Sequence, residues 1–233
     1  MPLVTPSIVA HRGLHDLHPE NSLASFKAAW TSGVLWCECD IHCSADGIAI
    51  VIHDDTLDRT TNGCGDVATT SSKALQRVKL TPARGGKSDQ TIPLLRDVLE
   101  AMPAQAGLII EIKPIIPEDQ VRAILRLLSG RRAMLQSFHT QVLETIRRCD
   151  NDISLAWLIE QPEQLAEAVS SDWRAIHLKH TLLDVGSHAQ LRQARKKIGV
   201  WTVNTEVDAK RILALGVETL ITDDPAVLRG LIQ

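Results

Sequence analysis

Short apolar segments of β-strand length alternate along the chain with longer segments in which apolar residues recur at helical spacing. The apolar segments predict strands at residues 8–11, 34–41, 108–112, 134–138, 154–159, 175–179, 200–203 and 218–222. The amphipathic segments predict helices at residues 22–32, 92–100, 118–128, 141–148, 163–169, 189–197, 207–215 and 225–231. Strands and helices that alternate in this way form a parallel sheet covered by helices.

Eight such units are the number that closes a (β/α)8 barrel. An open, doubly wound sheet is the competing architecture, but no glycine-rich phosphate loop follows the first predicted strand. We therefore predict an α/β fold, a single TIM barrel spanning residues 1–233. At the start of its first helix, 22–32, we expect Asn21 to be the N-cap.

The alternation is interrupted after the second predicted strand. Asp46 and Gly47 separate two alternating runs and, as a two-residue turn, predict a hairpin in which His53 lies opposite Asp40. The residues that follow, 54–90, have weak periodicity, and so long an irregular segment is typical of a functional loop. We interpret the hairpin and residues 54–90 as a small insertion that caps the barrel mouth.

The composition limits the partners of such a barrel. Hydrophobic residues make up 44% and charged residues 23%, as in ordinary globular proteins, and the net charge of -3 argues against nucleic acid as a partner. We expect no stable membrane association, because no apolar run reaches the roughly 18 residues of a membrane helix. The N-terminus lacks signal-peptide features, and the five cysteines have no paired spacing, so we expect a cytoplasmic protein with reduced thiols. A homo-oligomer is compatible with this composition.

Carboxylates gather at the ends of the predicted strands, where barrel enzymes place their functional side chains. Glu38 and Asp40 are two positions apart in one strand and share a face, whereas Cys37 and Cys39 point to the other face. Glu111, in the neighbouring strand, completes a set of oxygen ligands suited to a divalent cation. Pairing of the same carboxylates with Arg or Lys in a structural network is the alternative.

Histidines and basic residues accompany these carboxylates. His11 and His53 are candidates for a general acid and base, because imidazole titrates near neutral pH. Arg12 offers a planar fork for phosphate, and Lys113 shares the face of Glu111, either as its ion-pair partner or as a phosphate contact. On loops or surfaces we expect the remaining histidines: His15, His18, His42, His139, His177, His180 and His188.

These residues belong to an ordered series of motifs that resembles the glycerophosphodiester phosphodiesterase family, particularly its short cytoplasmic bacterial members. The resemblance spans the chain from His11 to Pro225. The motifs are His11-Arg12-Gly13, Pro19-Glu20-Asn21, Glu38-x-Asp40, Asp46-Gly47, His53-Asp54, Leu57-Asp58-Arg59-Thr60-Thr61-Asn62-Gly63, Glu111-Ile112-Lys113, Trp201-Thr202-Val203-Asn204 and Thr222-Asp223.

The resemblance implies a metal-dependent barrel that hydrolyses glycerophosphodiesters, its small-molecule substrates, to sn-glycerol 3-phosphate and an alcohol. The resemblance implies that the ligands of one divalent cation, Mg²⁺ or Ca²⁺, are Glu38, Asp40 and Glu111. As the general acid and base it implies His11 and His53. It also implies that the substrate-binding residues are Arg12, Glu20, Lys113 and Trp201. Of these, Trp201 would form a wall of the glycerol pocket.

Other interpretations stay open at this point. A related barrel phosphodiesterase could act on lysophospholipids or phosphoinositides, and a non-catalytic barrel could bind glycerophosphate. A metal barrel of the aldose isomerase type would leave Arg12 and the insertion unexplained. The motifs are also compatible with attack on phosphorus either by the glycerol 2-hydroxyl, through a cyclic phosphate, or by water.

Overall fold

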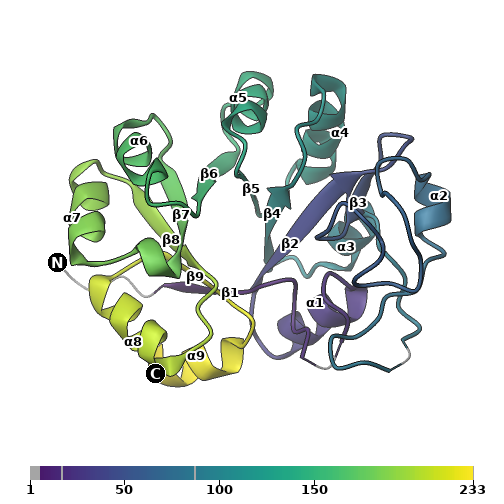
Figure 1. Ribbon diagram of the computed structural model, residues 1–233, viewed down its shortest axis with the longest axis horizontal. Helices are drawn as coiled ribbons and strands as arrows, with labels where there is room; N and C mark the ends of the chain where they lie inside the picture. The colour runs from purple at the N-terminus through teal and green to yellow at the C-terminus, as the bar shows by residue number, and fades with distance from the viewer. Residues whose placement is uncertain (1–5, 17, 87, 233) are drawn as a thin grey trace.

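The computed structural model describes residues 6–16, 18–86 and 88–232. Within them, eight parallel strands form a closed barrel, because β1 is paired with both β9 and β2. The barrel strands are β1 (Ser7–Ala10), β2 (Trp36–Cys43), β4 (Gly107–Ile112), β5 (Ala133–Ser137), β6 (Ser154–Ile159), β7 (Ala175–Lys179), β8 (Lys197–Trp201) and β9 (Thr219–Thr222). The predicted (β/α)8 barrel is confirmed (Figure 1).

Helices follow the strands and cover the outside of the barrel, as the arc of α4 to α9 in Figure 1 shows. They are α1 (Leu23–Thr31), α3 (Leu95–Ala101), α4 (Glu118–Leu128), α5 (Thr140–Cys149), α6 (Gln164–Ser170), α7 (Val185–Gln193), α8 (Glu206–Leu215) and α9 (Pro225–Ile232), with a 3-10 turn, η1 (His180–Leu182), before α7. In the part of the chain that the structure describes, no helix has the length and apolar character needed to cross a bilayer.

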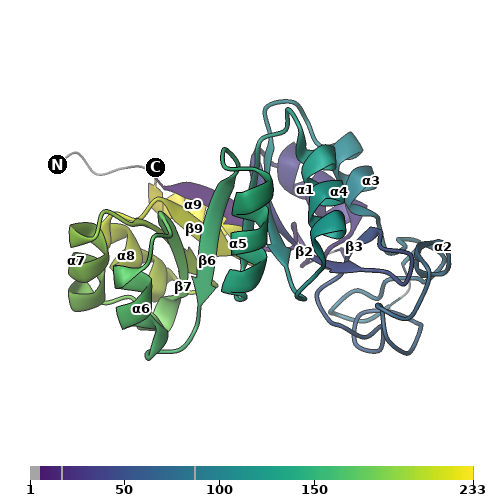
Figure 2. The same ribbon diagram turned by 90° about the horizontal axis from the view of Figure 1, so that it is seen from above.

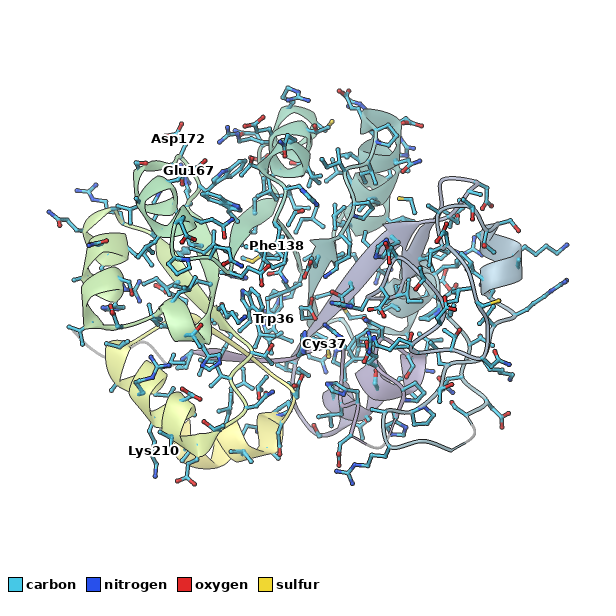
Figure 3. The ribbon with its side chains drawn as sticks, in the orientation of Figure 1. Trp36, Cys37, Phe138, Glu167, Asp172 and Lys210 are labelled. Carbon is cyan, nitrogen blue, oxygen red and sulfur yellow. The ribbon has the colours of Figure 1, made fainter. Side chains whose placement is uncertain are left out.

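The two-residue period of β2 separates its apolar and acidic side chains. Cys37 and Cys39 are fully buried in the layer between barrel and helices, together with Phe26 of α1. Trp36 joins a small apolar cluster inside the barrel, and in Figure 3 it lies near the centre of the ring of strands, whereas Lys210 lies at the outer edge. Because Glu38 and Asp40 share the face of Trp36, both carboxylates project into the barrel.

Two glycines make room for large side chains inside the barrel. A Cβ atom at Gly107 would lie 2.6 Å from the ring of Trp36. A Cβ atom at Gly199 would lie 2.3 Å from Cδ2 of His177, which is opposite it in the β7–β8 register. The barrel interior is therefore packed around these rings and has no space for an added methyl group at either glycine.

The hairpin after β2 differs from the predicted register by one residue. Strand β3 (Ala49–Val51) runs antiparallel to β2 and places Ile41 opposite Val51. The prediction that His53 lies opposite Asp40 is wrong, because the Asp40 carbonyl accepts a hydrogen bond from the backbone N–H of Ile52 at 3.0 Å. The turn contains three residues rather than two, and Gly47, at φ 74°, provides the left-handed residue that such loops need.

The insertion after β2 is confirmed and has a core of its own. It contains the short helix α2 (Ser72–Leu75), and Figure 2 places α2 at the end of the molecule opposite α7. Its buried apolar side chains are Ile50, Ile52, Leu57, Val67, Leu75, Leu80, Ile92 and Leu94. Lys87, within the predicted range 54–90, lies outside the described residues. Because this second cluster is separate from the main one, the insertion holds its loops against its own core.

The cap of the first helix was predicted one residue early. Ser22, rather than Asn21, caps α1, and its side chain accepts a hydrogen bond from the backbone N–H of Ser25. Asn21 adopts a left-handed conformation, with φ at 55°, which directs its side chain elsewhere. A short polar side chain close to a helix start can either cap the helix or occupy a left-handed turn position, so the local sequence does not distinguish these two roles.

The predicted helix 189–197 and strand 200–203 were also placed too late. Helix α7 begins at Val185 because the Asp184 side chain accepts a hydrogen bond from the backbone N–H of Ser187, a favourable N-cap. Strand β8 then begins at Lys197 and ends at Trp201.

Replacement of Gly199 by Ala tests the packing of the barrel interior. We expect Gly199→Ala to lower the free energy of unfolding by roughly 1–3 kcal/mol, because the new methyl group overlaps the His177 ring. Gly230→Ala, where an added Cβ meets nothing within 4 Å, is the matched control and should cause no loss. Urea denaturation of both variants measures the effect, and equal stabilities would contradict this account of the interior.

Candidate active site

The carboxyl ends of the strands open into a cavity of about 270 Å³. Most of the predicted site residues line it: His11, Arg12, Glu38, His53, Glu111, Lys113 and Trp201. Asp40 is buried beside the lining carboxylates, and Glu20 is hydrogen-bonded to Arg12. The structure therefore brings the predicted residues together at one mouth of the barrel, the end at which TIM-barrel enzymes carry their active sites.

Three buried carboxylates form the centre of this site. The β2–β4 register places Asp40 beside Glu111, and one oxygen each of these two and of Glu38 lie within 4.8 Å of one another. Oδ1 of Asp40 has no hydrogen-bond partner among the described residues, and Oε1 of Glu111 forms an ion pair with Nζ of Lys113. Three converging carboxylate oxygens, one of them without a hydrogen-bond partner among the described residues, fit a hard divalent cation, so these residues could hold a metal.

Two basic side chains offset part of this negative charge. Nε of Arg12 lies 3.1 Å from Oδ2 of Asp40, and Nζ of Lys113 lies 2.8 Å from Oε1 of Glu111. Burial alone would raise the pKa of Asp40, but attraction from Arg12 and Lys113 outweighs it and lowers that pKa to about 2.

The two glutamates respond in the opposite direction. Burial, with repulsion from Asp40 and Glu111, raises the pKa of Glu38 well above its usual value. Burial, with repulsion from Asp40, raises the pKa of Glu111 to about 7. The protein's own cations therefore neutralise this acidic cluster only in part, and a bound cation would stabilise the ionised form of both glutamates.

Asn21 positions Asp40, a role that sequence reasoning missed. Its Nδ2 donates to Oδ2 of Asp40 at 2.9 Å, and its Oδ1 accepts from the backbone N–H of Asp40 at 3.2 Å. Asn21 is 1% exposed, and both it and Arg12 have positive φ values in the loop after β1. The signal available in the sequence was its place in the Pro19-Glu20-Asn21 motif, which we interpreted as a cap.

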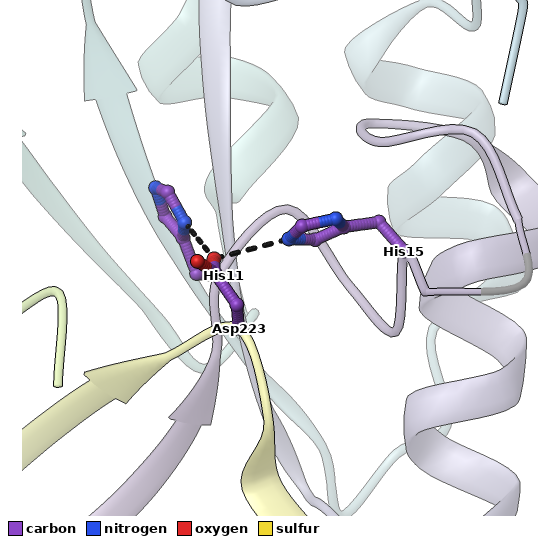
Figure 4. Close-up of side chains that lie close together, drawn as sticks. All are labelled: His11, His15 and Asp223. Atoms are coloured by element: carbon purple, nitrogen blue, oxygen red, sulfur yellow. Dashed lines mark hydrogen bonds and ion pairs between the residues drawn. The ribbon is translucent and has the colours of Figure 1, made fainter. Parts of the chain in front are cut away.

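His11 is held by an aspartate from the last strand-to-helix loop. Its Nδ1 lies 2.6 Å from Oδ1 of Asp223, which His15 also approaches through Nε2 at 3.0 Å (Figure 4). Asn204 donates to the other oxygen of Asp223 at 2.6 Å. These imidazole hydrogen bonds outweigh the effect of burial and lower the pKa of Asp223. Because a carboxylate only accepts, the proton of His11 is on Nδ1, and Nε2, 4.0 Å from Oε2 of Glu38, is left for the site.

His53 has the same type of support from the insertion. Its Nδ1 lies 2.5 Å from Oδ1 of Asp54, and its Nε2 lies 3.2 Å from Nζ of Lys113. Burial, together with the charges of Arg12 and Lys113, lowers the pKa of His53 despite nearby Asp40. Both imidazoles are thus fixed through Nδ1 and direct Nε2 toward the cavity, the orientation that proton transfer there requires.

The expected surface positions of His42 and His177 are wrong, because both lie on barrel strands and are buried. Nδ1 of His177 lies 2.7 Å from Oε1 of Gln136, and Nε2 of Gln136 is 3.5 Å from Oε1 of Glu38. A histidine in an apolar strand such as 175–179 can be accommodated only where a partner inside the barrel satisfies it, and this partner comes from a distant strand.

Trp201 closes one wall of the cavity. Its Nε1 donates to the carbonyl oxygen of His177 at 3.1 Å, and its ring meets Phe138 edge to face at a centroid distance of 5.6 Å. The ring is therefore held at both its polar and its apolar edge.

A TIM barrel that combines an acidic cluster, two oriented imidazoles and two basic side chains at its mouth is typical of metal-assisted hydrolases of phosphate esters. The model of the glycerophosphoryl diester phosphodiesterase family matches residues 11–227. The chain belongs to this family. Its predicted class of enzyme, a phosphodiesterase, is confirmed, which argues against the alternative of a barrel that only binds glycerophosphate.

Relatives and solved structures agree with this assignment. The glycerophosphodiester phosphodiesterase of Caldanaerobacter subterraneus subsp. tengcongensis is 30% identical over 240 residues, which cover 97% of each chain. That of Bacillus altitudinis is 30% identical over 231 residues, covering 94% of each. An Oleispira antarctica phosphodiesterase, solved in complex with its product sn-glycerol-3-phosphate, superimposes with a TM-score of 0.86 at 26% identity and covers 97% of this chain and 96% of that one.

The buried His177 predicts how stability changes with pH. Burial lowers the pKa of His177 from 6.5 to about 4, so between these values the unfolded chain binds a proton that the folded chain does not. Stability should therefore fall as pH falls through this window, by about 3 kcal/mol from this residue.

Urea denaturation between pH 7 and pH 4 measures this loss. His177→Asn should make the decline shallower, whereas His139→Asn, at an exposed position, should leave it unchanged. Parallel curves for His177→Asn and the wild type would contradict the prediction.

Proposed function

We propose that this protein catalyses the metal-dependent hydrolysis of glycerophosphodiesters to sn-glycerol 3-phosphate and an alcohol. The observation that carries the proposal is the convergence of the acidic cluster, the two imidazoles, Arg12 and Lys113 on one cavity. The Oleispira antarctica phosphodiesterase with bound sn-glycerol-3-phosphate supports it, since its fold matches nearly the whole of this chain.

The metal site in this proposal consists of Glu38, Asp40 and Glu111, which would hold one Mg²⁺ or Ca²⁺ ion. All three supply the hard oxygen ligands that these ions prefer. When bound, the ion would act as a Lewis acid toward a phosphoryl oxygen. With Arg12 and Lys113 it would make the site net positive, which favours an anionic diester and the further negative charge of the transition state.

The phosphate would be bound by Arg12 and Lys113, whose charged ends line the cavity. Arg12 offers a planar fork that matches phosphate oxygens, and Lys113 offers a compact charge. Glu20 lies against Arg12 at 2.9 Å and positions that guanidinium in this proposal. Trp201 would form a wall of the glycerol pocket, held there by Phe138.

His11 and His53 are the general acid and base of the proposal. One imidazole Nε2 takes the proton of the attacking hydroxyl as its oxygen bonds to phosphorus. The other, in its doubly protonated imidazolium form, donates its Nε2 proton to the alcohol oxygen as the bond between that oxygen and phosphorus breaks. If the attacking hydroxyl is that of water, this step yields glycerol 3-phosphate directly; if it is the glycerol 2-hydroxyl, water then opens the cyclic phosphate with the two imidazoles in exchanged roles. Each imidazole has its Nδ1 held by an aspartate, so the proton transfers use Nε2, the atom that faces the site.

A cytoplasmic location is part of the same proposal. The five cysteines have free thiols, and Cys37 and Cys39 are buried away from the cavity in the helix layer. Unpaired cysteines are typical of a reducing compartment.

Loss of His53 tests the acid–base roles. We expect His53→Ala to lower kcat for glycerophosphocholine by roughly 10²- to 10⁴-fold, because proton transfer loses its donor or acceptor. The control is His188→Ala on α7, outside the cavity, which should keep wild-type turnover. Near-normal turnover by His53→Ala would remove His53 from the mechanism.

Removal of the ion tests the acidic cluster. We expect EDTA to abolish release of glycerol 3-phosphate and Mg²⁺ or Ca²⁺ to restore it. Loss of a residue that only supports a metal ligand typically weakens metal binding roughly 10- to 100-fold. We expect Glu38→Gln, which changes a ligand itself, to weaken binding of the ion by more than this, as measured by calorimetry. Glu167→Gln on α6 is the matched control, and activity that is indifferent to chelators would refute the metal site.

A further inference from the structure

Arg59 makes an unusual number of contacts for a side chain that is 48% exposed. It lies in the insertion, within the 57–63 motif that has no role in the mechanism above. Its Nε and Nη2 donate to the two oxygens of Asp54 at 2.6 and 2.8 Å. Its Nη1 and Nη2 donate to the two oxygens of Glu20 at 3.0 and 2.9 Å. One guanidinium thus holds two carboxylates, each through two hydrogen bonds.

Each of these carboxylates holds a group that lines the cavity. Asp54 accepts from Nδ1 of His53 at 2.5 Å, and Glu20 accepts from Nη1 of Arg12 at 2.9 Å. Arg59 itself is not part of the cavity lining. A continuous chain of charged hydrogen bonds therefore joins Arg12 to His53 across the mouth, with Arg59 as its central link.

The same contacts keep both carboxylates ionised. Hydrogen bonds from Arg59 lower the pKa of Asp54, and they lower the pKa of Glu20 although burial opposes this. An ionised carboxylate only accepts hydrogen bonds, so Asp54 requires the proton of His53 to be on Nδ1.

The insertion fixes the loop that carries Arg59. Leu57 is 3% exposed and packs in the insertion's own core, and its backbone N–H donates to the carbonyl of Gly65 at 2.9 Å. Its carbonyl accepts from Oγ1 of Thr61 at 2.6 Å. Hydrogen bonds and packing at Leu57 therefore fix the turn from which Arg59 extends.

We propose that Arg59 is a positioning residue for the reaction, which aligns the His53 imidazole and the Arg12 guanidinium at the same time. It thereby couples the insertion to the phosphate-binding side of the barrel mouth. The proposal rests on the proposed function, because it assigns the alignment of two groups of that same site. Lysine cannot replace arginine here, since an ammonium group is a point charge and cannot hold two carboxylates in a planar fork.

Steady-state kinetics of Arg59 variants test the proposal. We expect Arg59→Ala to lower kcat/KM for glycerophosphocholine roughly 10- to 100-fold, with the fall in kcat caused by misplaced His53 and the rise in KM by misplaced Arg12. Arg59→Lys should retain most of this loss. Arg77→Ala, an exposed arginine of the same insertion, is the matched control and should keep wild-type kinetics.

A double-mutant cycle separates positioning from a general effect of charge. In an Asp54→Asn background, Arg59→Ala should lower kcat by much less than it does in the wild type, because the link to His53 is already broken. Full additivity of the two losses would overturn the proposal, and so would recovery of wild-type kcat/KM by Arg59→Lys.

A readout without substrate makes this test independent of the proposed function. In long-range ¹H–¹⁵N spectra the wild type should show His53 protonated at Nδ1, and Arg59→Ala and Arg59→Lys should show a mixture of the two tautomers. Unchanged His53 signals in both variants would overturn the positioning role. A shift in these signals in a protein that does not cleave glycerophosphodiesters would refute the proposed function but leave this inference intact.

Discussion

Three carboxylates are buried with one oxygen of each within 4.8 Å of the others, and the groups around them must offset their mutual repulsion. Like charges removed from water at that distance repel strongly, and the fold tolerates them only where cations and hydrogen-bond donors face them. Arg12 and Asn21, from the loop after β1, and Lys113, which follows β4, supply that compensation. Because the compensation is incomplete for Glu38 and Glu111, these carboxylates could hold an additional cation.

Each of the two imidazoles is oriented by an aspartate, and the two aspartates come from different parts of the fold. Asp223, at the end of the last barrel strand, holds Nδ1 of His11, and Asp54, in the insertion, holds Nδ1 of His53. The supporting shells differ. Asp223 is also hydrogen-bonded to His15 and Asn204, which belong to barrel loops, whereas Asp54 is hydrogen-bonded to Arg59 of the insertion. The insertion therefore contributes a histidine that lines the cavity and the aspartate that orients it, and it has an apolar core of its own.

The interior below the site shows why a barrel is a suitable scaffold for these groups. Val9, Ile109 and Ile221 form a buried apolar cluster inside the barrel, and Gln136 joins the buried His177 to Glu38. Side chains on rigid, hydrogen-bonded strands lose little further freedom when a ligand binds, so the charged groups are held in place before the substrate arrives.

The barrel, its insertion and most of the residues that line the candidate site could be predicted from the sequence, because these predictions depend on local periodicity and on motifs. The period of two in β2 was enough to send Glu38 and Asp40 inward and Cys37 outward. The tertiary structure decided the one-residue register of the hairpin, the role of Asn21 beside Asp40, the burial of His177 and the link from Arg59 to Glu20. The hydrogen bond between His11 and Asp223 joins residues 212 positions apart. A pattern of neighbouring residues carries no information about such partners, since closure of the barrel alone brings the first and last strands together.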